Sequence, residues 1–179
     1  GHSLGGEVGL MLAARHPAAV GRLVVVDALP FYSLLFSPLA TVESATPGAQ
    51  AFRDAWLKAT PEQLAAMQEA SAARLTTSAE SRAAVSAWGR DSDRKTVAAA
   101  AYELATTDLR PELPRIQAAT TVVYAHHPAY GPAAQVDALF SAAYQGLAEA
   151  RLVRVDNSLH FVMLDQPKVF NEAVAQALR

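Results

Sequence analysis

The sequence contains no cysteine. This absence excludes disulfide bonds, cysteine-ligated metals and a cysteine nucleophile. Charge is also scarce, because 18% of the residues are charged and the formal net charge is −2. Such a balance gives no electrostatic attraction to nucleic acid or to an anionic membrane surface. No apolar run approaches the ~18 residues that a membrane span requires. We therefore expect no nucleic-acid partner and no membrane span.

The composition is that of a folded globular protein. Hydrophobic residues make up 51% of the 179 residues, which is too apolar for a disordered chain. The length predicts one domain. No internal repeat and no low-complexity linker interrupts the chain. We expect a soluble protein, either cytoplasmic or exported.

The first six residues read G-x-S-x-G followed by a second glycine. A serine on a sharp strand-to-helix turn needs neighbours without a Cβ, because the backbone there is strained and closely packed. Gly1 and Gly5 would supply these neighbours. The apolar run from Gly6 to about His16 predicts a helix whose positive end is directed at the Ser3 hydroxyl. Ser3 is therefore the candidate nucleophile, and the alternative is a glycine-rich turn without a chemical role.

Three short β-branched runs predict strands that are buried on both faces, as in a parallel sheet. They are residues 22–27, 120–125 and 150–155. Residues 31–107, between the first two runs, show no strand pattern and carry helix-start signals. Thr60 and Thr77 each begin a sequence that is typical of a capping box. A further alanine-rich helix is predicted from about residue 93 to residue 106.

The hexapeptide G-H-S-L-G-G resembles the nucleophile elbow of the α/β-hydrolase superfamily, and the resemblance extends over nearly the whole chain. It implies an α/β fold in which residues 1–30 and 108–179 form the core and residues 31–107 form an inserted helical lid. In the superfamily about five strands precede the elbow. We therefore expect this chain to be the C-terminal part of a larger protein, with the last three strands of the sheet. Alone, with an open sheet edge, it is expected to be inactive and aggregation-prone.

A serine nucleophile needs a base, and imidazole has a pKa close to neutral pH. Among five histidines, His160 lies where the superfamily places its base, on a loop after the last strand. The following residues resemble the superfamily pattern G-H-F-x-x-x-E-Q-P, with Ser158-Leu159 in place of the small glycine. The order Ser3 before His160 also matches this fold. The resemblance thus implies that His160 is the general base, and the alternative is a surface-loop histidine.

The acid of the catalytic triad has several candidates. The superfamily usually has an aspartate after the strand that returns from the lid, and His127 stands there in this chain. Asp27, at the end of the preceding strand, is our candidate acid, because some lipases of this fold place theirs there. A structural strand-end aspartate is the alternative. Asp137, on a predicted helix, is expected to be solvated. A third interpretation is an enzyme without the acid, a loss that can lower the rate about 10⁴-fold.

No cofactor is expected, and no metal. The adjacent side chains of His126 and His127 diverge, and no carboxylate or cysteine spacing supports a metal site. The resemblance assigns the backbone N–H of Leu4 to the oxyanion hole. The second donor of that hole normally comes from a loop after an early strand.

The substrate pocket is expected to include His2, Phe31, Leu35 and Phe36, and the alternative for each is packing within the core. The apolar lid favours esters of small or medium apolar acids as the small-molecule substrate. We therefore expect a serine hydrolase that works through an acyl-enzyme. The alternatives are a carbon–carbon bond hydrolase and a non-catalytic member of the fold that binds an apolar ligand or a partner protein under the lid.

Overall fold

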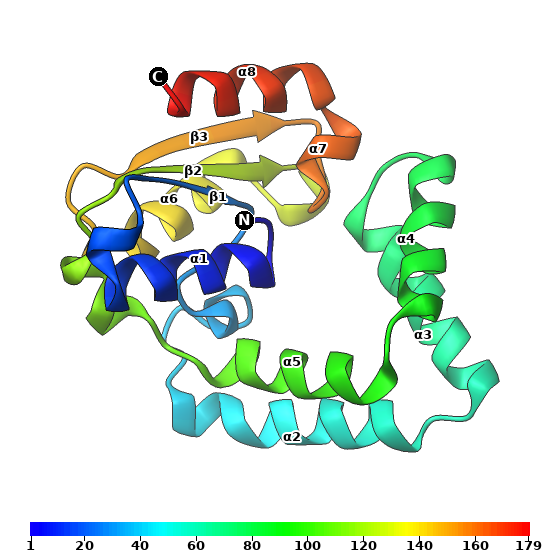
Figure 1. Cartoon of the computed structure of the whole chain (residues 1–179). Helices are drawn as coiled ribbons and strands as arrows, with labels where there is room; N and C mark the ends of the chain where they lie inside the picture. The colour runs from blue at the N-terminus through cyan, green and yellow to red at the C-terminus, as the bar shows by residue number, and fades with distance from the viewer.

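The computed structural model describes residues 1–179. At its centre is a parallel sheet with the strand order β1-β2-β3, formed by Arg22–Val26 (β1), Ala119–His126 (β2) and Arg151–Asp156 (β3). His2 adds an isolated parallel bridge to Val26 on the other side of β1. The three predicted strands are confirmed. Because they are parallel, their carboxyl ends meet at one edge of the sheet (Figure 1).

Helices cover both faces of the sheet (Figure 1). One face packs against α1 and α6, and the other against α8; their bounds are Leu4–Arg15 (α1), Ala133–Ala143 (α6) and Pro167–Ala177 (α8). Successive residues of β2 alternate between these two cores. Val122 and Tyr124 belong to the first core, and Val123 and Ala125 belong to the second. The central strand is therefore buried on both faces, which explains its continuous hydrophobic sequence.

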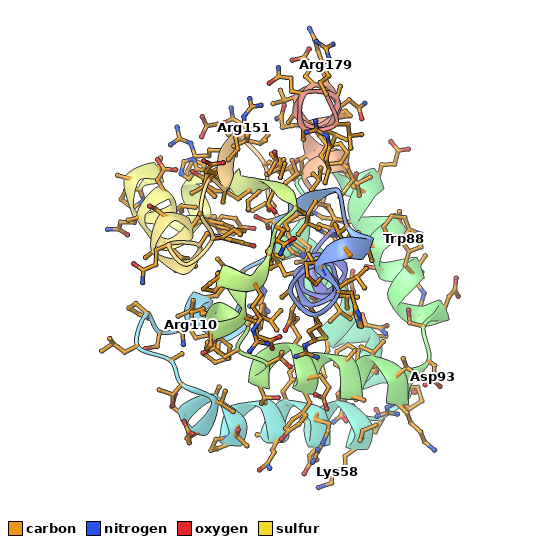
Figure 2. All side chains as sticks on the ribbon, turned by 60° about the vertical axis from the view of Figure 1, so that its left-hand side comes forward. Lys58, Trp88, Asp93, Arg110, Arg151 and Arg179 are labelled. Atoms are coloured by element: carbon orange, nitrogen blue, oxygen red, sulfur yellow. The ribbon has the colours of Figure 1, made fainter.

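Four longer helices connect β1 to β2, namely Val42–Lys58 (α2), Pro61–Leu75 (α3), Ala79–Asp91 (α4) and Arg94–Thr106 (α5). The helices α2 and α5 lie side by side, and α3 and α4 form a second pair beside the carboxyl ends of the strands (Figure 1). In Figure 2, Lys58 and Arg179 lie at opposite ends of the molecule. No helix combines the length and the hydrophobicity needed to cross a lipid bilayer.

Shorter helical turns complete the chain. They are Pro17–Ala19 (η1), Tyr32–Leu35 (η2), Arg110–Arg115 (η3), Pro128–Tyr130 (η4) and Val162–Asp165 (α7). The turn η2 leaves the carboxyl edge of the sheet after β1. The turn α7 follows β3 at the same edge and leads into α8 (Figure 1).

The helix starts show one confirmed cap and one that is displaced. Thr60 accepts a hydrogen bond from the Gln63 N–H, and the Gln63 side chain accepts one from the Thr60 N–H, which is the predicted capping box. The prediction of a cap at Thr77 is wrong, because Ser78 caps α4. Thr77 instead donates both its N–H and its hydroxyl hydrogen to Asp165. The cap of α4 therefore lies one residue later than predicted, at Ser78, while Thr77 bonds to the distant Asp165.

Candidate active site

Ser3 occupies a tight turn between the bridge to β1 and the start of α1. Its φ of 52° lies in a region that non-glycine residues rarely adopt. The Ser3 N–H donates to the carbonyl oxygen of Val26 at 3.0 Å, so the turn is fixed to the end of β1. The Ser3 side chain makes no capping hydrogen bond to α1. Leu4 is the first residue of α1, so its N–H has no acceptor within the helix.

Glycines allow this turn to pack closely, although not the pair that the sequence indicated. A Cβ on Gly1 would lie 1.9 Å from the carbonyl oxygen of Gly5, and a Cβ on Gly6 would lie 2.9 Å from the Cβ of Ala28. A Cβ on Gly5 would meet nothing within 4 Å. The prediction for Gly1 is therefore confirmed, and the prediction for Gly5 is wrong. It is Gly6 whose missing side chain lets α1 approach β1 and the segment after it.

Asp27 follows β1 directly and binds the imidazole of His160. The His160 Nδ1–H donates to Asp27 Oδ2 at 2.7 Å, and the Ala125 N–H donates to Asp27 Oδ1 at 2.8 Å. The φ of Asp27 is 45°, so the chain turns sharply where this side chain leaves the sheet. Both carboxylate oxygens have partners, which fixes the orientation of the carboxylate. Because Nδ1 of His160 carries the hydrogen, Nε2 is left as a proton acceptor.

The other candidates for the acid position lie elsewhere. His127 accepts the Ala129 N–H at its Nδ1. Asp137 accepts the Tyr124 hydroxyl hydrogen at 2.8 Å and pairs with Arg154 at 2.5 Å. Of the carboxylates weighed from the sequence, Asp27 is the one that contacts His160. No group of three or more histidine, aspartate or glutamate side chains is arranged to hold a metal ion.

His2 packs directly on His160. The two ring centroids lie 4.4 Å apart, and His2 Nε2 lies 3.0 Å from the carbonyl oxygen of His160. A carbonyl oxygen can only accept, so Nε2 of His2 carries the hydrogen. Burial, and then the nearby His160, lower the pKa of His2 to about 4, so His2 is neutral at pH 7. His2 therefore supports the candidate base, in addition to any role in lining a pocket.

Ser3, Asp27 and His160 lie at the same edge of the sheet. Ser3 binds the carbonyl of Val26, the next residue is Asp27, and Asp27 binds His160. The imidazole makes its hydrogen bond to Asp27 and none to the Ser3 hydroxyl. Contacts between nucleophile and base are often long in unliganded enzymes and shorten when substrate binds. The three side chains thus lie at one edge of the sheet, with Nε2 of His160 free of the contact to Asp27.

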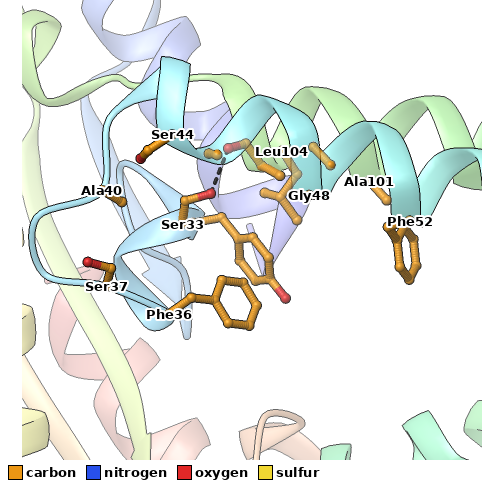
Figure 3. Close-up of a pocket in the computed structure, with 13 residues that line it drawn as sticks. Ser33, Phe36, Ser37, Ala40, Ser44, Gly48, Phe52, Ala101 and Leu104 are labelled. Atoms are coloured by element: carbon orange, nitrogen blue, oxygen red, sulfur yellow. Dashed lines mark hydrogen bonds between the residues drawn. The ribbon is translucent and has the colours of Figure 1, made fainter.

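A mostly apolar cavity of about 500 Å³ lies between η2, α2 and α5 (Figure 3). Phe36 and Phe52 are among its lining residues, and Figure 3 shows both rings bordering the open space. Of the residues expected in a pocket, Phe36 therefore lines this cavity. Phe31 is completely buried in the main core, and Leu35 is 52% exposed outside the cavity. The backbone of η2 thus sends neighbouring apolar side chains in different directions.

Asp165 is a residue of this region that the sequence analysis missed. Its carboxylate contacts both the residue before His160 and the connection between α3 and α4. A signal for it was present, because Asp165 stands where the superfamily pattern after the histidine has glutamate.

The Alpha/beta hydrolase family model matches residues 1–173. The chain therefore belongs to the α/β-hydrolase family. No curated protein matches the chain.

Solved structures share the fold over almost the whole chain. The enol-lactonase from Burkholderia xenovorans LB400 is 26% identical with a TM-score of 0.70, and the match covers 99% of this chain and 64% of that one. A hydrolase from Pseudomonas aeruginosa PA01 is 24% identical with a TM-score of 0.78, covering 99% and 63%. An esterase from Thermogutta terrifontis is 20% identical with a TM-score of 0.72, covering 100% and 63%. The chain thus spans less than two thirds of the length of these structures.

Proposed function

We propose that the protein is a serine hydrolase that cleaves carboxylic esters through an acyl-enzyme. In this proposal Ser3 is the nucleophile, His160 is the general base and Asp27 is the acid that orients the imidazole. The observation that carries it is the 2.7 Å hydrogen bond from His160 Nδ1 to Asp27 Oδ2, beside the strained turn at Ser3. The family to which the chain belongs and the esterase among its structural neighbours support the same chemistry.

The proposed reaction has two halves. Ser3 Oγ attacks the substrate carbonyl while His160 Nε2 takes the hydroxyl proton, and the Leu4 N–H donates to the oxyanion. The same proton is then given to the leaving alcohol as its bond to the carbonyl carbon breaks. Water, deprotonated by His160, attacks the acyl-enzyme, and the imidazolium returns the proton to Ser3 Oγ as its bond to the acyl carbon breaks and the carboxylic acid leaves. The ion pair of the imidazolium with Asp27 stabilises both transition states.

Residues 31–107 are proposed to be the lid, and the cavity between η2, α2 and α5 is proposed to hold the acyl group. Nine of the 13 residues that line this cavity are hydrophobic, and its volume suits a small or medium apolar group. A cyclic ester is opened by the same steps as a linear one, so lactones belong to the proposed substrate class. The enol-lactonase among the similar structures supports their inclusion.

The non-catalytic alternative depended on His127 standing where an aspartate is expected. The contact between Asp27 and His160 weakens that argument, because a carboxylate from another strand meets the imidazole. A carbon–carbon bond hydrolase uses the same three side chains, so substrate tests are needed to separate it from an esterase.

A fluorophosphonate probe on the protein at its natural length tests the proposal. We expect a covalent adduct on Ser3 and hydrolysis of p-nitrophenyl butyrate. Ser3→Ala should abolish both, whereas Ser71→Ala, a change at an exposed position of α3, should leave both unchanged. A folded wild-type protein that forms no adduct and hydrolyses no ester would overturn the proposal in favour of a ligand-binding protein.

A further inference from the structure

The Asp165 carboxylate joins two segments that are far apart in the sequence. Its Oδ1 accepts the Thr76 hydroxyl hydrogen at 2.6 Å, and the Thr77 hydroxyl hydrogen and N–H at 2.9 Å each. Its Oδ2 accepts the Leu159 N–H at 2.8 Å. Thr76 and Thr77 form the connection between α3 and α4, and Leu159 directly precedes His160. One side chain therefore holds the proposed lid and the proposed base together.

A backbone contact strengthens this junction on the other side of His160. The Phe161 N–H donates to the carbonyl oxygen of Leu75 at 2.9 Å. The Phe161 ring also packs near Trp88 of α4, with the ring centroids 6.0 Å apart, and Figure 2 shows Trp88 on this helix. Phe161 therefore contacts the α3–α4 pair directly, and Leu159 is linked to its connection through Asp165. The ring of His160 itself contacts Asp27 and His2.

The junction is polar and partly buried. Thr76 is completely buried. Burial would raise the pKa of Asp165, but the hydrogen bonds from Thr76, Thr77 and Leu159 outweigh it, and the pKa lies below its ordinary value. Arg82 holds the same connection through the carbonyl oxygens of Thr76 and Thr77, at 3.2 and 2.8 Å. Hydrogen bonds to an ionised acceptor are stronger than neutral ones, so an unseated connection would lose several of them together.

We propose that Asp165 is a positioning residue that couples the seating of the lid to the competence of the general base. It holds the Leu159–Phe161 backbone so that the imidazole of His160 stays against Asp27 while the α3–α4 connection is docked. When the α3–α4 connection separates from Asp165, the loop that carries His160 is no longer held, and the imidazole is no longer aligned with Asp27. This inference rests on the proposed serine hydrolase function and assigns a regulator of the same site.

Asp165→Asn is the direct test, because it keeps the size of the side chain and removes its charge and one acceptor. We expect kcat/KM for p-nitrophenyl butyrate to fall at least tenfold in the protein at its natural length. The loss should fall on kcat, with KM within about twofold of wild type, because a misaligned imidazole impairs proton transfer and not substrate binding. A merely structural role would lower the melting temperature and leave kcat of the folded variant unchanged.

Two further variants change the junction at the residues of the proposed lid that bind Asp165. Thr77→Val removes an exposed hydroxyl without changing the volume, and it keeps the proposal testable if Asp165→Asn does not fold. We expect a several-fold loss of kcat/KM, again carried by kcat. Thr76→Val should add little to Asp165→Asn in the double variant, because both remove the same link. Asp91→Asn, at the exposed end of α4, is the matched control and should behave as wild type.

The outcomes separate this proposal from the function on which it rests. Folded Asp165→Asn and Thr77→Val variants with wild-type kcat and KM would overturn the coupling, while an inactive Ser3→Ala would leave the hydrolase function intact. An active Ser3→Ala would instead overturn the function itself. Hydrogen exchange gives an independent readout: in Thr77→Val the amides of Leu159 and of residue 77 should exchange faster together, and unchanged exchange at Leu159 would contradict the coupling.

Discussion

Asp27 Oδ2 lies 2.7 Å from His160 Nδ1, although 133 positions separate the two residues in the sequence. The carboxylate is itself held by the Ala125 N–H, so its direction is set by the central strand of the sheet. This orientation fixes the imidazole tautomer and leaves Nε2 as the acceptor for a proton. The predictions below test this contact and its surroundings.

Asp27→Asn should lower kcat about 10³- to 10⁴-fold with little change in KM, because the amide favours the wrong imidazole tautomer. Steady-state hydrolysis of p-nitrophenyl butyrate by the protein at its natural length measures the effect. Asp137→Asn is the matched control, since Asp137 binds Tyr124 and Arg154 instead of His160. A larger loss in the Asp137 variant than in the Asp27 variant would reassign the acid.

His2→Phe should change how stability depends on pH. The pKa of His2 is about 4 in the folded protein, below its ordinary value of 6.5, so the unfolded chain binds more protons between these pH values. Wild-type stability is therefore lost as the pH falls through this window, by on the order of 1–3 kcal/mol from this residue. Urea unfolding at several pH values should show a shallower acid loss in His2→Phe. His16→Phe, at an exposed position, should keep the wild-type slope.

Glu7→Gln should remove a loss of stability that occurs as the pH rises, whereas His2→Phe removes one that occurs as the pH falls. Glu7 is 2% exposed, and neither of its carboxylate oxygens has a hydrogen-bond partner. Burial, and then the charge of Glu103, raise the pKa of Glu7 from 4.5 to about 8. The folded state thus binds the extra proton in this window, and wild-type stability falls as the pH rises through it.

The glutamine variant does not titrate, so it should gain stability over wild type between pH 5 and pH 8. The gain should be a few kcal/mol, at roughly 1.4 kcal/mol for each pKa unit. Urea unfolding across this range measures it, and Glu80→Gln at an exposed position of α4 is the control. Parallel pH dependences of wild type and Glu7→Gln would show that Glu7 is not the titrating group.

Gly48→Leu should narrow the cavity. A Cβ at Gly48 would meet nothing within 4 Å, and the residue lines the cavity from α2. We expect kcat/KM for p-nitrophenyl octanoate to fall at least fivefold relative to the acetate ester. Replacing a helical glycine should also raise stability by about 0.5–1 kcal/mol. Ala51→Leu, at an exposed position of the same helix, should preserve the chain-length preference. An unchanged preference in Gly48→Leu would place the acyl group elsewhere.

The parts of the fold that depend on local sequence could be predicted. The runs that became β1, β2 and β3 are apolar at successive residues because both faces of the sheet are covered, and that pattern needs no knowledge of the partners. The capping box at Thr60 is also local, because its donors and acceptors lie within one turn. The turn at Ser3 was predicted from the spacing of its glycines. Which of these positions has no room for a Cβ depends on the packing of α1 on β1, and the sequence does not show that packing.

The remaining features depend on contacts between distant segments. Two carboxylates, Asp27 and Asp137, were candidates for the acid, and the one that meets His160 is decided by the geometry of neighbouring strand ends. Phe31 and Phe36 are equally apolar, yet the irregular backbone between them buries one in the core and places the other at the cavity. The role of Thr77 was hidden for the same reason, because its partner Asp165 lies 88 positions away.

The separation of Asp27 from its imidazole also bears on biosynthesis. A ribosome that has translated the serine turn and β1 has made the proposed nucleophile and the proposed acid but not the proposed base, since His160 follows 133 positions after Asp27. Under the proposed function, a nascent chain cannot hydrolyse an ester until β3 has paired with β2 and the loop after it has folded. A premature stop codon ahead of residue 160 would then release a product without the proposed base.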